Sequence, residues 1–189
     1  MRETSPGSNP LDADPRAPST PPRAKRRARI VEGLRVLSLR HLEEGTASIE
    51  RALRPHDLWP LPQPGNSRLT DPWLVSVNKS ETLLITAQND LANSVLVDLT
   101  AGKADLAYVA DQSAGYVTFE LSGSGLSEVQ QSLMDSSSIP QRDGQTSCTR
   151  LMDIRVIIIR LDTTRILLVL DRMYRNYAEQ WIAKATENE

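Results

Sequence analysis

The chain has 189 residues, a formal net charge of −2 and 39% hydrophobic residues, enough for one sizeable domain or two small ones over a shared core. Its longest nearly uninterrupted apolar runs, 156–159 and 166–170, are far shorter than the roughly 20 residues that a membrane-spanning helix needs. A single cysteine, Cys148, excludes an internal disulfide framework and a cysteine-rich zinc site, and the first residues lack the apolar segment of a secretory signal. We therefore expect a cytoplasmic protein.

Residues 1–28 form a basic, proline-rich segment that holds six of the twelve prolines. Almost no apolar side chain is present there to compensate the entropy lost on ordering, so the segment is predicted to be a disordered extension. Its basic run between Arg23 and Arg29 could contact a polyanion or an acidic partner, but a solvated tail is the more economical interpretation. From residue 30 onward, 15 basic residues face 21 acidic ones, which disfavours a nucleic-acid-binding surface.

The first half of the remaining chain alternates between expected strands and helices. A strand at 36–40 precedes a helix at 46–54, which Thr46 can cap, and Pro55 then begins an irregular connector through residue 65. A strand at 73–77 follows, and Ser80 is a plausible cap for a helix that continues to about residue 96. A turn at Gly102 and Lys103 leads into a strand at 106–110.

The second half is predicted to be richer in strands. Residues 116–121 alternate apolar and polar side chains, the period of a half-buried strand, and a glycine-containing turn at 122–125 leads into a helix at 126–134. Three further strands are expected at 146–150, 154–161 and 165–170, followed by a helix at 173–185. Four successive apolar residues at 156–159 predict a strand that is buried on both faces.

These elements indicate an α+β fold. Several connections are too short for the crossovers that parallel strands require. We therefore expect two small lobes, at about 34–110 and 114–185, each with an antiparallel or mixed sheet that helices cover on one face.

The sequence contains no recognisable set of catalytic residues, no cofactor-binding motif and no set of metal ligands. Gly123 and Gly125 lie between a strand and a helix, but Glu128 stands where a dinucleotide fingerprint needs a small residue, so a tight turn is favoured. The only histidines, His41 and His56, have no ligand at metal-like spacing.

Three other features have both a structural and a functional interpretation. Cys148 lies beside Arg150 without a visible general base, and packing as a small apolar residue is favoured. Aspartates at 153, 162 and 171 interleave with arginines at 150, 155, 160, 165 and 172, which favours local ion pairing on a solvated face. The aromatic residues Tyr174, Tyr177 and Trp181 could face a partner, but their amphipathic spacing favours packing of the last helix onto its own sheet.

The order of several short segments resembles the γ subunit family of heterotetrameric sarcosine oxidase. The segments, spread over about residues 34–183, are Leu37-Ser-Leu-Arg40, Leu61-Pro-Gln-Pro-Gly-Asn66, Asp71-Pro-Trp-Leu-Val75, Val109-Ala-Asp111, Val117-Thr-Phe-Glu-Leu-Ser-Gly123, Gln145-Thr-Ser-Cys-Thr-Arg-Leu151, 156–160, Leu168-Val-Leu-Asp-Arg-Met-Tyr174 and Tyr177-Ala-Glu-Gln-Trp181. Each segment alone is a weak signal, and their collinear order carries the resemblance.

The resemblance implies a fold similar to the folate-binding aminomethyltransferase domain. It also implies a structural, non-catalytic subunit of a complex that oxidatively demethylates a secondary amine such as sarcosine, with folate as the one-carbon acceptor. The implied partners are a large α-type subunit, a flavin-bearing β-type subunit and a small zinc-binding δ-type subunit. FAD, FMN, NAD, tetrahydrofolate and zinc are implied in those partners, and none of them in this chain.

Alternatives remain open at this point. The chain departs from the family pattern at Thr70-Asp-Pro-Trp73 and at 133–138, so the amine substrate is not fixed, and N-methylglutamate dehydrogenase has a similar small subunit. A stand-alone folate-binding protein and an interaction module that uses the basic tail are hypotheses of other classes.

Overall fold

The computed structural model describes residues 25–101 and 106–187, which form two antiparallel sheets and four α-helices. The strands are β1 (Arg27–Ile30), β2 (Arg35–His41), β3 (Trp73–Asn78), β4 (Glu81–Thr86), β5 (Ala107–Asp111), β6 (Tyr116–Ser122), β7 (Thr146–Leu151), β8 (Ile154–Asp162) and β9 (Arg165–Asp171). The helices are α1 (Thr46–Leu53), α2 (Asn89–Ala101), α3 (Leu126–Leu133) and α4 (Arg175–Glu187), with short 3₁₀ turns that include η5 (Arg172–Tyr174).

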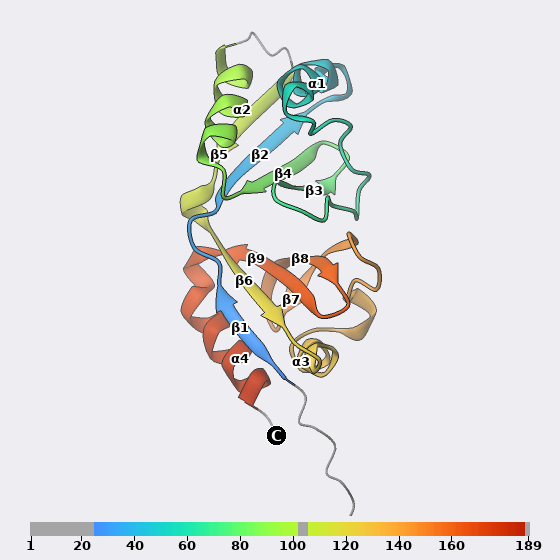
Figure 1. Cartoon of the computed structure of the whole chain (residues 1–189), viewed down its shortest axis with the longest axis vertical. Coiled ribbons are helices and arrows are strands. Elements are labelled where there is room, and N and C mark those ends of the chain that lie inside the picture. The colour runs from blue at the N-terminus through green and yellow to red at the C-terminus, as the bar shows by residue number, and fades with distance from the viewer. Residues whose placement is uncertain (1–24, 102–105, 188–189) are drawn as a thin grey trace, which may run out of the picture.

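The elements stack in four layers, with helices outside and sheets inside (Figure 1). One sheet has the strand order β3-β4-β2-β5 and carries α1 and α2 on its outer face. The other has the order β1-β6-β9-β8-β7 and carries α3 and α4. The α+β class with antiparallel sheets and helices on one face, expected from the sequence, is therefore confirmed.

The inner faces of the two sheets pack on each other and form a third core between the layers. Val36, Val75 and Leu83 of the first sheet meet Ile157 and Val169 of the second there, and all five are at most 6% exposed. A strand between two cores must be apolar on both faces. This explains β8: Val156 and Ile158 face the helices, and Ile157 and Ile159 face the other sheet, as the apolar run predicted.

The expected helix at about 80–96 is wrong, because its first part is strand β4. Ser80 does not cap a helix; its backbone N–H donates to the Asn78 side chain and closes the turn between β3 and β4. Leu84 then faces the helices while Leu83 and Ile85 face the other sheet, so both faces of β4 are buried. The helix begins only at Asn89, after Thr86 accepts a hydrogen bond from the Gln88 N–H.

Both ends of the chain also differ from the expectation. Most of the predicted disordered extension, and the turn at Gly102 and Lys103, lie outside the described residues. Arg27 and Ala28, however, belong to β1, which pairs with β6. At the other end, the Asp171 carboxylate accepts from the Met173 N–H, so a 3₁₀ turn comes first and α4 begins two residues later than predicted.

The glycine-containing turn after β6 holds the start of β1 in place. Gly123 adopts φ +126°, and a Cβ there would lie 1.9 Å from the Lys25 carbonyl oxygen. The same Lys25 carbonyl accepts from the Gly125 N–H, and the Lys25 N–H donates to the Ser124 hydroxyl. The sequence prediction of a tight turn is correct, and its structural role is to seat the start of β1.

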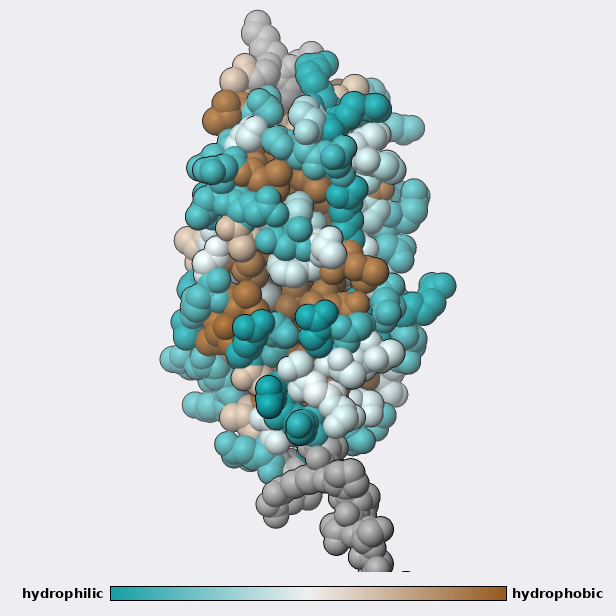
Figure 2. Space-filling view, viewed as in Figure 1, coloured by the Kyte–Doolittle hydropathy of each residue, from teal (hydrophilic) through white to brown (hydrophobic). Residues whose placement is uncertain are grey.

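No helix in the described part of the chain is long and apolar enough to cross a membrane. The surface is mixed, with apolar patches near the level where the two sheets meet and mostly polar side chains around them (Figure 2).

Candidate functional site

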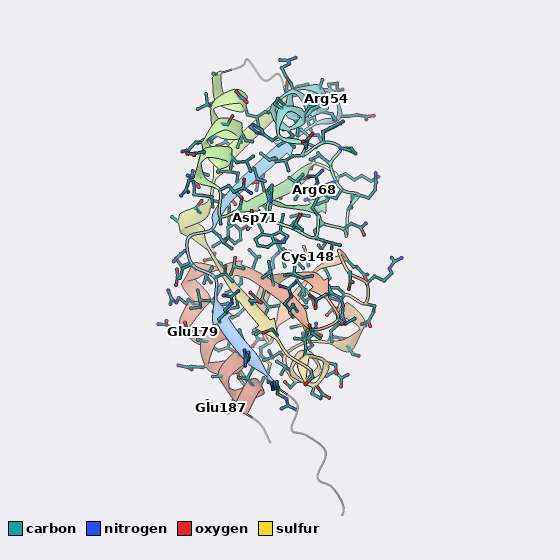
Figure 3. The ribbon with its side chains drawn as sticks, viewed as in Figure 1. Arg54, Arg68, Asp71, Cys148, Glu179 and Glu187 are labelled. Carbon is teal, nitrogen blue, oxygen red and sulfur yellow. The ribbon has the colours of Figure 1, made fainter. Side chains whose placement is uncertain are left out.

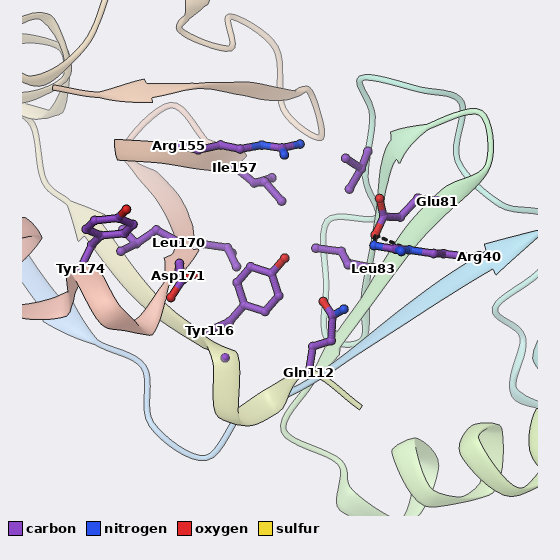
Figure 4. Close-up of a pocket in the computed structure, with 13 residues that line it drawn as sticks. Arg40, Glu81, Leu83, Gln112, Tyr116, Arg155, Ile157, Leu170, Asp171 and Tyr174 are labelled. Atoms are coloured by element: carbon purple, nitrogen blue, oxygen red, sulfur yellow. Dashed lines mark hydrogen bonds and ion pairs between the residues drawn. The ribbon is translucent and has the colours of Figure 1, made fainter. Parts of the chain in front are cut away.

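A cavity of about 460 Å³ lies where the two sheets separate at one end of their shared core. Its apolar wall comes from both sheets, through Val77 and Leu83 on one side and Ile157 and Val169 on the other. Polar and aromatic side chains complete the lining: Arg40, Glu81, Gln112, Tyr116, Arg155, Asp171 and Tyr174. Of these, Tyr116 and Arg155 extend across the opening toward Arg40 and Glu81 (Figure 4). The cavity thus combines an apolar wall with convergent polar groups, as ligand sites usually do.

Glu81 is the most strongly held polar group of this cavity. Its Oε1 accepts hydrogen bonds from the Ser38 hydroxyl at 2.9 Å and from the Arg40 Nε and Nη2 at 3.0 and 2.9 Å. Burial alone would raise the pKa of the Glu81 carboxyl, but the hydrogen bonds from Ser38 and Arg40 outweigh it, and the net pKa is lowered. Glu81 is therefore a fixed carboxylate on the β2–β4 side of the cavity.

Tyr116 supplies a hydrogen-bond donor from the other sheet. It is half-buried, and burial, followed by the nearby charge of Glu81, raises the pKa of its phenol. The hydroxyl consequently keeps its proton at neutral pH. Its ring stands between the two sheets and points toward Arg40 and Glu81 (Figure 4).

Three donors at the cavity have no hydrogen-bond acceptor within the described ranges 25–101 and 106–187. They are the Tyr116 hydroxyl, the Gln112 side-chain amide and the Arg155 guanidinium. Such donors favour a bound group that brings oxygen acceptors, such as a carboxylate. The lining includes no serine, cysteine, histidine or lysine, and its ionisable groups are the carboxylates Glu81 and Asp171, the phenols Tyr116 and Tyr174, and the guanidinium groups of Arg40 and Arg155.

The residues that the sequence singled out do not assemble into a site. His41 contacts the Leu42 carbonyl and the Thr46 hydroxyl, and within the described residues no three His, Cys, Asp or Glu side chains are grouped to hold a metal ion. Cys148 is exposed on β7, near the level where the sheets face each other (Figure 3), so the expected packing in an apolar environment is wrong. The turn at Gly123 is structural.

The predicted pairing of arginines with aspartates holds for one pair only. Arg165 binds Asp162 at 2.7 Å, whereas Arg160 donates to the Pro140 and Thr163 carbonyls and Arg172 to the Tyr116 carbonyl. Arg150 and Arg155 oppose each other across β7 and β8, and Arg155 reaches the cavity. Arginines and aspartates that alternate along the sequence therefore do not, apart from Arg165 and Asp162, form ion pairs with each other.

The aromatic residues of the last helix divide between core and surface. Trp181 packs partly against the core beneath α4, but Tyr174 and Tyr177 are 42% and 39% exposed. The prediction that all three pack onto the sheet is wrong for the tyrosines. The buried face of α4 consists instead of Ala178, Ile182 and Ala185.

Sequence reasoning missed Arg40, Glu81, Gln112 and Tyr116 as site residues. The incorrect helix placed Glu81 in a first helical turn and hid its position beside β2. The available signal was a charged residue near each of two largely apolar segments of the observed strands: Arg40 directly follows Val36–Leu39, and Glu81 precedes Leu83–Ile85 by two positions. Their pairing depends on the β2–β4 register, Arg40 opposite Glu81, which the sequence alone does not specify.

No protein-family model matches the chain, and no curated protein matches it in sequence. Solved structures do match. A chain of heterotetrameric sarcosine oxidase from Corynebacterium sp. U-96, in complex with pyrrole 2-carboxylate, is 19% identical with a TM-score of 0.72, over 85% of this chain and 83% of that one. Glycine cleavage system aminomethyltransferase T from Bartonella henselae is 14% identical with a TM-score of 0.59, and the match spans 87% of this chain but only about half (47%) of the aminomethyltransferase. These likenesses confirm the expected aminomethyltransferase-like fold.

Proposed function

We propose that this chain is a non-catalytic subunit of a heterotetrameric sarcosine oxidase-type complex. The observation that carries the proposal is the likeness to the sarcosine oxidase chain, because it extends over most of both chains rather than over a shared fragment. The collinear segments of the sequence support the same conclusion independently and favour the γ-type subunit.

The complex is proposed to demethylate a secondary amine oxidatively, with sarcosine as the first candidate and N-methylglutamate as the alternative. The proposed partners are the α-type, β-type and δ-type subunits, which would carry FAD, FMN, NAD, tetrahydrofolate and zinc. The non-catalytic role is proposed from the resemblance to the γ-type subunit, and the cavity between the sheets would then serve as a binding site.

The test is purification of the tagged chain from its native host, followed by an absorbance spectrum and an amine-oxidation assay. We expect a stoichiometric flavoprotein that oxidises sarcosine or N-methylglutamate, whereas the chain produced alone should be colourless and inactive. Recovery of the chain without a flavoprotein would contradict the subunit proposal. A flavin spectrum from the isolated chain would contradict its non-catalytic character.

A free-standing folate-binding protein is the second candidate, and one feature of the cavity favours it. Glu81 presents a fixed carboxylate beside apolar walls, and its Oε2 accepts no hydrogen bond from the described residues. Titration of the isolated chain with tetrahydrofolate tests this candidate. Saturable binding that Glu81→Gln abolishes would support it, and the absence of binding would remove it.

A further inference from the structure

The start of the last helix exposes an unusual group of large side chains. Met173 is 75% exposed, Tyr174 42% and Tyr177 39%, and the ring of Tyr177 meets Trp181 edge-on at 6.2 Å. Positions 173, 177 and 181 are four residues apart, so within α4 Tyr177 and Trp181 share one flank of the helix. We name the side chains of Arg155, Met173, Tyr174, Tyr177 and Trp181 the α4 surface.

The composition of the α4 surface is that of an interface centre. Methionine, tyrosine, tryptophan and arginine are the residue types enriched where proteins bind each other. Two of the chain's four tyrosines and one of its three tryptophans fall within eight residues here. Single exposed apolar residues are normal, but a contiguous group of this kind marks an interaction site.

The α4 surface is continuous with the mouth of the cavity. Tyr174 and Arg155 line that cavity together, and Arg155 has no hydrogen bond or salt bridge to any residue in the described ranges. Lys184 lies 5.3 Å from the centre of the Trp181 ring and adds a second cation at the other end of the surface. A complementary partner must therefore bring both an apolar centre and at least one carboxylate.

We infer that the α4 surface docks another subunit of the complex, which covers the cavity mouth and places a carboxylate against Arg155. This inference rests on the proposed function. The partner's apolar contact covers Met173 and Tyr177, and its carboxylate supplies the acceptor that Arg155 lacks.

A second copy of this chain fits the α4 surface less well. In a two-fold contact the same surface serves on both copies, so each cation would meet only groups from this surface and its rim. The carboxylates near it already have partners within the chain: Asp171 Oδ1 accepts from the Met173 N–H, Glu81 Oε1 from Ser38 and Arg40, and Glu179 from Arg175. Charge complementarity therefore favours a different, carboxylate-bearing chain.

The experiment compares tagged variants purified from the native host, with flavin absorbance per tagged chain as the readout. Met173→Asp combined with Tyr177→Asp introduces charge into the α4 surface by replacing two exposed side chains. Val97→Asp is the matched control, because Val97 is 57% exposed on α2, at the opposite end of the molecule (Figure 1). Thermal melts of each isolated variant verify that it folds.

We expect at least about a tenfold loss of co-purified flavoprotein for the double variant and for Arg155→Glu, and wild-type recovery for Val97→Asp. If the wild type binds a flavoprotein and the α4 variants bind it equally well, this surface is refuted while the subunit proposal stands. If the wild type binds none, both fail. If the isolated wild-type chain is a dimer that the double variant dissociates, the occupant is a second copy and the inference is wrong.

Discussion

At the scale of single residues, local contacts decide which side chains matter. Gly123 is required by a carbonyl that arrives from 98 residues earlier in the chain, and Glu81 is fixed by hydrogen bonds from β2. Asp162 shows the same principle within a turn, since it accepts from Thr164 and from Arg165. The residue type alone does not predict any of these roles, because each depends on the groups that surround the side chain or backbone in the fold.

Gly123→Ala should destabilise the protein by about 1–3 kcal/mol, because the added methyl meets the Lys25 carbonyl and the backbone is already at positive φ. Gly115→Ala is the control, since a Cβ there has no neighbour within 4 Å. Urea unfolding measures both free energies. Equal stability of the two variants would show that the Lys25 carbonyl does not seat against this turn.

Acid should weaken the fold partly through Asp162. Burial alone would raise the pKa of this carboxyl, but hydrogen bonds from Arg165 and Thr164 lower it to about 2. Because the pKa in the unfolded chain is about 3.9, the contribution is complete above about pH 4 and is lost as the pH falls toward 2. The pair is partly exposed, so the effect should be at most about 1 kcal/mol.

Asp162→Asn should therefore lower the free energy of unfolding slightly at pH 7 and flatten its decline between pH 4 and pH 2. Urea titrations at several pH values measure this change. A variant with the wild-type pH dependence would assign the acid sensitivity to other carboxylates, such as Glu81 and Asp111, whose pKa values are also lowered.

At the scale of elements, α4 is held by small and aliphatic residues while its aromatic flank stays largely at the surface. Ala178 and Ile182 are at most 2% exposed and pack in the core shared with α3 and the second sheet. The periodicity of the sequence identifies an amphipathic helix, but the neighbouring side chains decide which apolar residues enter the core. The flank that stabilises the fold is therefore distinct from the exposed flank that we propose as a docking surface.

Ile182→Ala should cost about 2–5 kcal/mol, because it leaves a cavity in that core. Tyr177→Ala should cost less, about 0.5–1.5 kcal/mol, since Tyr177 is 39% exposed and loses mainly its edge-on contact with Trp181. Denaturant unfolding of the isolated chain distinguishes the two. A large cost for Tyr177→Ala would mean that the α4 surface is part of the fold rather than a docking surface.

At the scale of the whole molecule, the three cores make the two sheets one unit. The core between the sheets contains side chains from both, so neither sheet can unfold without exposing the inner face of the other. Trp59 packs at the outer core of the first sheet, Trp73 at the core between the sheets and Trp181 at the outer core of the second sheet, so each core has a tryptophan reporter.

Leu83→Ala should lower the stability of the entire described fold by about 2–5 kcal/mol, because Leu83 is 1% exposed in the core between the sheets. Tryptophan fluorescence and far-UV circular dichroism should still change together in one transition. Two separate transitions, with only the first sheet affected, would show that the sheets fold independently.

Deleting residues 1–30 should lower the melting temperature, because it removes β1 and the packing of Ile30 against the core of the second sheet. Deleting residues 1–24 is the control and should change little, since that segment has almost no apolar side chains to bury. Thermal melts compare the two. A large decrease for the shorter deletion would show that the extension is docked.

The sequence by itself determined the fold class and most elements, because period-two alternation, amphipathic spacing and turn residues act over a few neighbours. It also identified β8 as a doubly buried strand from its apolar run. It could not distinguish β4 from a helix, since Leu83, Leu84 and Ile85 suit either structure until a second sheet covers them. The cavity, the Arg40–Glu81 pair and the exposed side of α4 were decided only by the tertiary structure, because each depends on contacts between segments far apart in the chain.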